Sequence, residues 1–132
     1  MTKTRAAMAA AGLDALIVDD PLVMNWLSGY DGWSFCVHQG VLVLYDHDPT
    51  WWGRNQDANG ARRTVWMSDD RIHGYADHYV QSTVCHPMQD LAALIRNCGL
   101  ETGRISVELD NYYYTAKAHL PLMARLLVSR NM

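Results

Sequence analysis

The residues best suited to chemistry lie between Gly29 and Met67, a stretch that holds four of the five tryptophans in the chain. Small zwitterionic ligands are bound by an aromatic wall against their apolar or cationic face and by a guanidinium against their carboxylate. The stretch offers both, with Arg54 as the cation and Asp57 as a polar anchor. It therefore predicts a binding surface for a small polar molecule, although an aromatic core hairpin with a surface ion pair would show the same pattern. The aromatic candidates are Trp33, Phe35, Trp51 and Trp52.

Other catalytic arrangements find little support in the sequence. The six histidines include no pair at the spacing of a helical or finger-type metal site, and the three cysteines include no C-x-x-C pair. The sequence also lacks a G-x-S-x-G nucleophile turn and a glycine-rich phosphate loop. Cys36 falls within an apolar strand pattern, where a small buried thiol is a simpler interpretation than a nucleophile. We therefore expect no catalytic residue, no metal ligand and no cofactor in this chain.

The composition is that of a single globular domain. The 132 residues are 49% apolar and 19% charged, which is enough to bury a core and too apolar for a disordered chain. A net charge of −3 and a pI near 6.0 give no electrostatic basis for binding nucleic acid or an anionic membrane. No apolar run approaches the roughly 20 residues of a membrane span. The alanine-rich start fits a folded helix better than a signal peptide, and together with the unpaired cysteines it predicts a cytoplasmic protein.

Hydrophobic periodicity and turn residues divide the chain into helices and strands. The expected helices cover residues 4–11, 21–28, 87–98 and 111–130, the last of them interrupted by Pro121. The expected strands cover residues 15–20, 33–44, 50–54, 78–84 and 104–110, with a hairpin over 33–54 and a loop or short helix over 55–63. This order predicts an α/β fold in which a mixed β-sheet of about five strands is flanked by helices, in one domain spanning residues 1–132.

Three long blocks of the sequence, GYDGWSF, GRNQDANGARRTVWM and VELDNYYYTAKA, carry a family resemblance. Over residues 5–118 the chain resembles the N-terminal domain of the creatinase/prolidase-like (pita-bread) family, and is most similar to the branch of that family that hydrolyses ectoine, a cyclic amidine. The resemblance implies a small α/β domain of ribonuclease H-like fold. It also implies that catalysis, and any divalent metal, belong to a C-terminal domain that we expect to be absent here. Family members are commonly homodimers in which this domain covers the active site of the partner subunit.

The resemblance also assigns roles to individual residues. Phe35 matches a phenylalanine that contacts the substrate in creatinase, whereas Val37 stands where creatinase has the arginine that binds the substrate carboxylate. Creatine is therefore not the expected substrate, and Arg54 becomes the candidate cation for the carboxylate. Because side chains alternate along a strand, Trp33 should share the face of Phe35 and also contact the substrate. Asp57 completes the set of expected substrate-binding residues.

Three functional hypotheses stay open. The chain is the substrate-capping and dimerisation domain of an ectoine-hydrolysing enzyme and is inactive alone, with a small zwitterionic substrate and a second subunit as partners. Alternatively, it is the equivalent domain of another creatinase-like or aminopeptidase-like hydrolase, or a fragment that only binds or dimerises. Its end, LLVSRNM, does not match the family pattern. A truncated gene, a frameshift or a designed fragment would each explain that end.

Overall fold

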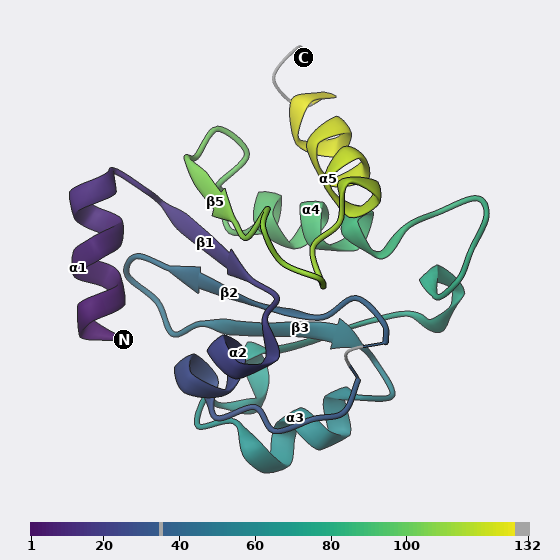
Figure 1. Ribbon diagram of the computed structural model, residues 1–132, viewed down its shortest axis with the longest axis horizontal. Helices are drawn as coiled ribbons and strands as arrows, with labels where there is room; N and C mark the ends of the chain where they lie inside the picture. The colour runs from purple at the N-terminus through teal and green to yellow at the C-terminus, as the bar shows by residue number, and fades with distance from the viewer. Residues whose placement is uncertain (35, 129–132) are drawn as a thin grey trace.

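The computed structural model describes residues 1–34 and 36–128, and a five-stranded sheet lies between two groups of helices (Figure 1). The helices are α1 (Thr2–Ala11), α2 (Pro21–Ser28), α3 (Ala58–Thr64), α4 (Pro87–Asn97) and α5 (Ala116–Val128), with short 3₁₀ helices η1 (Asp69–Arg71) and η2 (Asp77–Tyr79). The strands are β1 (Ala15–Val18), β2 (Gly40–Leu44), β3 (Thr50–Arg54), β4 (Ile72–Tyr75) and β5 (Ile105–Val107). The predicted α/β fold with a mixed sheet is confirmed. Each helix in the described ranges is too short or too polar to span a bilayer.

The strand directions bring four carboxyl ends to one edge of the sheet. The strand order is β4-β3-β2-β1-β5, and β2 pairs antiparallel with both β1 and β3. The outer strands are parallel to their neighbours, β5 to β1 and β4 to β3. Strands β1, β3, β4 and β5 therefore run in one direction, and β2 runs in the other. The residues that follow these four strands and those that precede β2 gather at a single edge.

Both faces of the sheet are covered, and each group of helices has its own apolar core. Ile17, Leu42 and Trp52 point to the face covered by α4 and α5. Alternate residues of the same strands point to the opposite face, which is covered by α1, α2 and α3. Because β2 is buried on both faces, its sequence GVLVL is apolar without alternation. The buried side chains of the second core include Met8, Met24, Leu27, Val41, Val43, Trp51 and Ala61.

Single residues explain where the helices begin and end. Gly12 and Gly29 adopt positive φ, 63° and 78°, at the carboxyl ends of α1 and α2, a conformation that glycine adopts without steric cost. Asp20 caps α2 by accepting two backbone N–H groups of its first turn, and Pro21 opens the helix with φ already suited to it. His86 begins α4 with a reciprocal capping box. These three helices were therefore predictable from local sequence.

The strand predicted over residues 33–44 is largely wrong. Residue 35 lies outside the described part of the chain, and the other residues from 33 to 39 form turns and irregular structure, so that β2 begins only at Gly40. The backbone N–H of Val37 donates to the carbonyl of Ser34 at 2.9 Å, which is a turn and not an extended strand. Cys36 is exposed, contrary to the expected buried thiol. The alternation that was expected to place Trp33 beside Phe35 therefore has no strand to support it.

Other predicted elements are also corrected. Residues 78–84 form the end of η2 and turns rather than a strand, and the fourth strand is β4, just before them. β4 was missed because IHGY has a histidine and a glycine at its centre, which are weak strand formers. Helix α5 begins at Ala116 and continues through Pro121, at the cost of one helical hydrogen bond. Cys98, the last residue of the helix expected over 87–98, lies just after α4 and is exposed.

Candidate functional site

The edge at which four strands end carries the candidate site. Asp19 follows β1, Arg54 ends β3, Tyr75 ends β4 and Glu108 follows β5. In α/β sheets, ligands bind beyond the carboxyl ends of the strands, where loops and helix ends present polar groups. Two hollows open at this edge, and Cys36 lines both of them.

The first of these, the tryptophan hollow, is the cavity lined by Trp33, Arg54 and Asp57 among others, with a volume of about 310 Å³. The structure thus brings together three of the four predicted site residues, whereas Phe35 lies outside the described residues. Trp33 comes from the irregular segment after α2 and is 85% exposed. Arg54 and Asp57 come from the end of β3 and the residue before α3. The predicted roles of all four residues in binding substrate stay predictions.

Arg54 and Asp57 are paired with each other. Nε of Arg54 donates to Oδ2 of Asp57 at 3.0 Å, and Nη2 of Arg54 donates to Oδ1 at 3.3 Å. Hydrogen bonding to Asp57 raises the pKa of the Arg54 guanidinium. The two side chains are 26% and 17% exposed, so the pair is partly in contact with solvent. A guanidinium already paired with a carboxylate presents little net charge to a ligand. Arg54 is therefore a weaker candidate for binding a substrate carboxylate than the sequence suggested.

The other aromatic candidates belong to the core. Trp51 and Trp52 are both 0% exposed and lie in opposite cores of the sheet. The ring of Tyr30 packs against that of Trp51 with centroids 5.3 Å apart, and its hydroxyl donates to Oε1 of Gln39 at 3.0 Å. Burial raises the pKa of Tyr30. Of the four aromatic residues named from the sequence, the described structure therefore places Trp33 alone at the surface of the hollow.

A buried carboxyl at the same edge was not predicted from the sequence. Asp19 is 2% exposed, and its Oδ2 has no hydrogen-bond partner among the described residues. Burial, reinforced by the charge of Glu108, raises the pKa of Asp19 to about 8, so this carboxyl is protonated at neutral pH. Oε2 of Glu108 accepts the backbone N–H groups of Asp19 and Asp20 at 2.7 and 2.9 Å, which ties the end of β1 to the end of β5. Asp19 and Glu108 are 89 residues apart in the sequence, and the parallel pairing of β1 with β5 brings their carboxyl groups together.

A histidine–carboxylate pair lies on the α4 side of the sheet. Nε2 of His73 lies 2.8 Å from Oδ2 of Asp90, and Nε1 of Trp52 donates to the same oxygen at 2.8 Å. Burial opposes ionisation of Asp90, but these two hydrogen bonds outweigh it and lower the pKa of Asp90. The arrangement ties β3 and β4 to α4. Over residues 1–34 and 36–128, no three histidine, cysteine or acidic side chains are grouped as metal ligands are.

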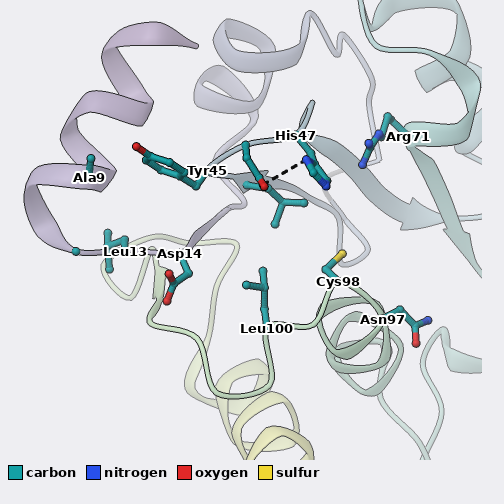
Figure 2. A pocket seen from close by; sticks show the side chains of 12 residues that line it. Ala9, Leu13, Asp14, Tyr45, His47, Arg71, Asn97, Cys98 and Leu100 are labelled. Carbon is teal, nitrogen blue, oxygen red and sulfur yellow. Dashed lines mark ion pairs between the residues drawn. The ribbon is translucent and has the colours of Figure 1, made fainter.

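A larger cavity, of about 810 Å³, lies at the opposite edge of the sheet (Figure 2). It is bounded by the ends of α1 and α4 and by the turn between β2 and β3. Its charged side chains are of mixed sign, with His47 and Asp46 paired at 3.3 Å. Figure 2 shows Asp14, His47 and Arg71 separated around the cavity rather than directed at one point. None of the predicted site residues lines it.

The fold and the edge site together define a class of protein, a small α/β domain with a five-stranded mixed sheet whose strand ends carry the candidate site. Residues 1–126 match the Creatinase/Prolidase N-terminal domain, and the chain belongs to this family. Ectoine hydrolase from Halomonas elongata is 50% identical over 125 residues, which is 94% of this chain and 31% of that protein. The uncharacterized hydrolase/peptidase y4tM from Sinorhizobium fredii is 39% identical over 96% of this chain and 32% of its own length. The chain therefore spans about a third of the length of these curated relatives.

Solved structures share the fold at low sequence identity. A proline dipeptidase from Streptococcus pneumoniae superposes with a TM-score of 0.74 at 21% identity, covering 96% of this chain and 84% of that one. The N-terminal domain of an Xaa-Pro dipeptidase from Lactobacillus brevis superposes with a TM-score of 0.74 at 14% identity, covering 93% of this chain and 84% of that one. At such identities these structures establish the fold and not the substrate.

Proposed function

We propose that this chain is the N-terminal domain of an ectoine hydrolase-like enzyme, in which it covers the substrate and joins two subunits while the chemistry occurs elsewhere. The observation that carries the proposal is the 50% identity to ectoine hydrolase over 94% of the chain. In the whole enzyme, the reaction is the hydrolytic opening of ectoine to N-acetyl-diaminobutyrate, in the cytoplasm. Any divalent metal belongs to the catalytic domain, and the active site is completed by the partner subunit of a homodimer.

The tryptophan hollow supports a role in binding rather than in bond cleavage. Ectoine is a small zwitterion with a planar amidinium group in its ring and a carboxylate, and a cation of this kind is bound well by the face of an indole. Trp33 lines the hollow and is exposed there. The Arg54–Asp57 pair beside it offers both hydrogen-bond donors and acceptors. Phe35, close to Trp33 in the chain, is proposed as a second apolar contact.

A chimera tests the proposal directly. Residues 1–126 replace the matching segment of Halomonas elongata ectoine hydrolase, and loss of ectoine with formation of N-acetyl-diaminobutyrate is followed by NMR. We expect a dimeric chimera that hydrolyses ectoine, and Trp33→Ala should lower its kcat/KM roughly tenfold. The 132-residue chain alone should not hydrolyse ectoine, because we propose that it lines the substrate pocket and supplies no acid–base groups.

The controls separate folding from function. The same replacement with the N-terminal domain of the Lactobacillus brevis Xaa-Pro dipeptidase, which shares the fold at 14% identity, should give an inactive enzyme. A chimera with the dimer mass and cooperative unfolding of the parent but without ectoine activity contradicts the proposal. So does turnover of ectoine by the isolated chain.

A second candidate is the equivalent domain of a peptidase-like hydrolase, which is favoured by the 39% identity to the hydrolase/peptidase y4tM. The two candidates are distinguished by assaying the cleavage of Xaa-Pro dipeptides. The assay uses the same chimera and the protein encoded by the longest reading frame that contains this sequence. Cleavage of dipeptides without ectoine hydrolysis supports the second candidate. Activity on neither substrate leaves a binding or dimerisation role.

A further inference from the structure

The second hollow at this edge, the histidine hollow, has a volume of about 180 Å³. It is bounded by residues 36–38, by the segment between η2 and α4, and by Lys117 in the first turn of α5. The hydroxyl of Tyr75 donates to the backbone carbonyl of His38 at 2.7 Å, which fixes the segment before β2. The rings of His38 and His86 pack together with centroids 4.7 Å apart. The hollow is thus formed by segments held in place by hydrogen bonding and packing.

The charges of the histidine hollow favour an anion. No aspartate or glutamate is among the described residues that line it, and Lys117 is its one lysine or arginine. Lys117 forms no ion pair with a described side chain. Burial lowers the pKa of His38 to about 4, with further contributions from His86 and Lys117. Burial and Lys117 also lower the pKa of His86, so both imidazoles are neutral at pH 7 and the ammonium charge is unmatched.

The neutral groups around Lys117 supply hydrogen-bond donors. Nδ1 of His86 accepts the backbone N–H of Met88 at 3.2 Å, so the neutral ring carries its proton on Nε2. Pro87, the first residue of α4, also lines the hollow, but the N–H groups of Met88 and Gln89 in that first turn already bond to His86. The ammonium of Lys117 and the imidazole N–H of His86 together match a carboxylate.

The size of the histidine hollow restricts it to one end of a ligand. Its volume of about 180 Å³ is below the roughly 300–1,000 Å³ of sites that enclose a whole small molecule. Cys36 lines both this hollow and the tryptophan hollow, so the two are adjacent. Such a hollow can hold the anionic end of a ligand, and Trp33 lines the neighbouring hollow.

We infer that the histidine hollow is the carboxylate subsite for a small zwitterionic substrate, with Lys117 as the binding cation and Nε2 of His86 as a hydrogen-bond donor. The identity of the zwitterion rests on the function proposed above. The inference gives Lys117 the role that the sequence suggested for Arg54, since the charge of Arg54 is matched by Asp57. The indole of Trp33 then faces the cationic ring of the same molecule.

The test uses the 132-residue chain labelled with ¹³C and ¹⁵N at lysine. The chain contains only Lys3 and Lys117, so two side-chain signals report on two well-separated positions. Ectoine and acetate should shift the Lys117 signal in a saturable manner, whereas the carboxamide of ectoine should not. The Lys3 signal should stay unchanged. A Lys117 signal that does not move, or that moves equally with chloride at the same ionic strength, overturns the inference.

Substitutions extend the test to affinity. Lys117→Met should weaken ectoine binding at least tenfold, Lys117→Arg should retain most of the affinity, and Lys3→Met is the matched control that should bind like the parent. Folding of each variant is checked by the dispersion of its amide NMR spectrum. A folded Lys117→Met variant that binds ectoine like the parent overturns the inference.

The subsite and the proposed function can fail separately. Binding of acetate and other carboxylates at Lys117 with no ectoine hydrolysis by the chimera supports the subsite and removes ectoine as its substrate. An active chimera whose kcat/KM for ectoine is unchanged by Lys117→Met supports the function and overturns the subsite.

Discussion

Asp19→Asn is expected to stabilise the protein by an amount that grows with pH. In the folded state the buried carboxyl keeps its proton up to a pKa of about 8, whereas the unfolded chain releases it above the ordinary value of 3.8. Between these values the folded state binds more protons, so the stability of the parent falls by up to about 1.4 kcal/mol per pH unit. An uncharged amide of similar shape has no such proton to release. The gain should be absent near pH 4 and on the order of 4 kcal/mol at pH 7.

The measurement is urea unfolding followed by tryptophan fluorescence at several pH values between 4 and 8. The decisive quantity is the slope of the stability difference with pH, because the packing of the new amide adds a constant that does not depend on pH. Asp31→Asn, at an exposed position, is the matched control and should change stability by less than about 0.5 kcal/mol. A stability difference for Asp19→Asn that does not vary with pH would refute the reasoning, since it would mean that Asp19 is ionised in the folded protein.

The other predictions concern stability and the edge site. Asp90→Asn should destabilise the protein by about 2 kcal/mol at pH 7, because the carboxylate accepts two side-chain N–H groups. The pKa of Asp90 is lowered on folding, so this loss should disappear as the pH falls, and an equal loss in urea unfolding at pH 3 would contradict it. Gly29→Ala should cost about 1 kcal/mol or more, since φ is 78° and the new Cβ would lie 2.9 Å from a backbone oxygen. Gly60→Ala, inside α3 with no atom within 4 Å of the new Cβ, should gain up to about 1 kcal/mol, so the two variants should shift the thermal unfolding midpoint in opposite directions. Arg54→Ala should cost less than about 1 kcal/mol of stability, and in the chimera it should lower kcat/KM less than Lys117→Met; the reverse order would restore Arg54 as the carboxylate ligand.

Helices were predictable from the sequence where their ends depend on single residues. Gly12, Gly29 and Pro21 act within one turn, and the helices that they bound lie close to the expected ranges. β4 was not predictable in this way. Its two central residues, His73 and Gly74, carry little strand preference, and the extended form of the segment depends on parallel pairing with β3 and on burial of Ile72 and Tyr75 in opposite cores. Such pairing is set by tertiary structure and leaves no local pattern.

The candidate site shows the same division between local and long-range information. Arg54 and Asp57 are three residues apart, and their pairing could have been anticipated from that spacing. Trp33 lies at the hollow as expected, but in an irregular segment rather than on a strand. Lys117 was not selected, because the block VELDNYYYTAKA that contains it indicated the family and no site residue. Its place beside residues 36–38 results from how α5 packs on α4 and the sheet.

The separation of the domain into two cores has a consequence for its evolution. Leu91 lies in one core and Met24 in the other, with the sheet between them. Truncating both side chains to alanine should therefore give free-energy losses that add, because the two positions share no packing partner. A domain of this kind can be repacked one layer at a time. Substitutions in one layer therefore leave the packing of the other unchanged, and the same fold is found in solved structures at 14% and 21% identity.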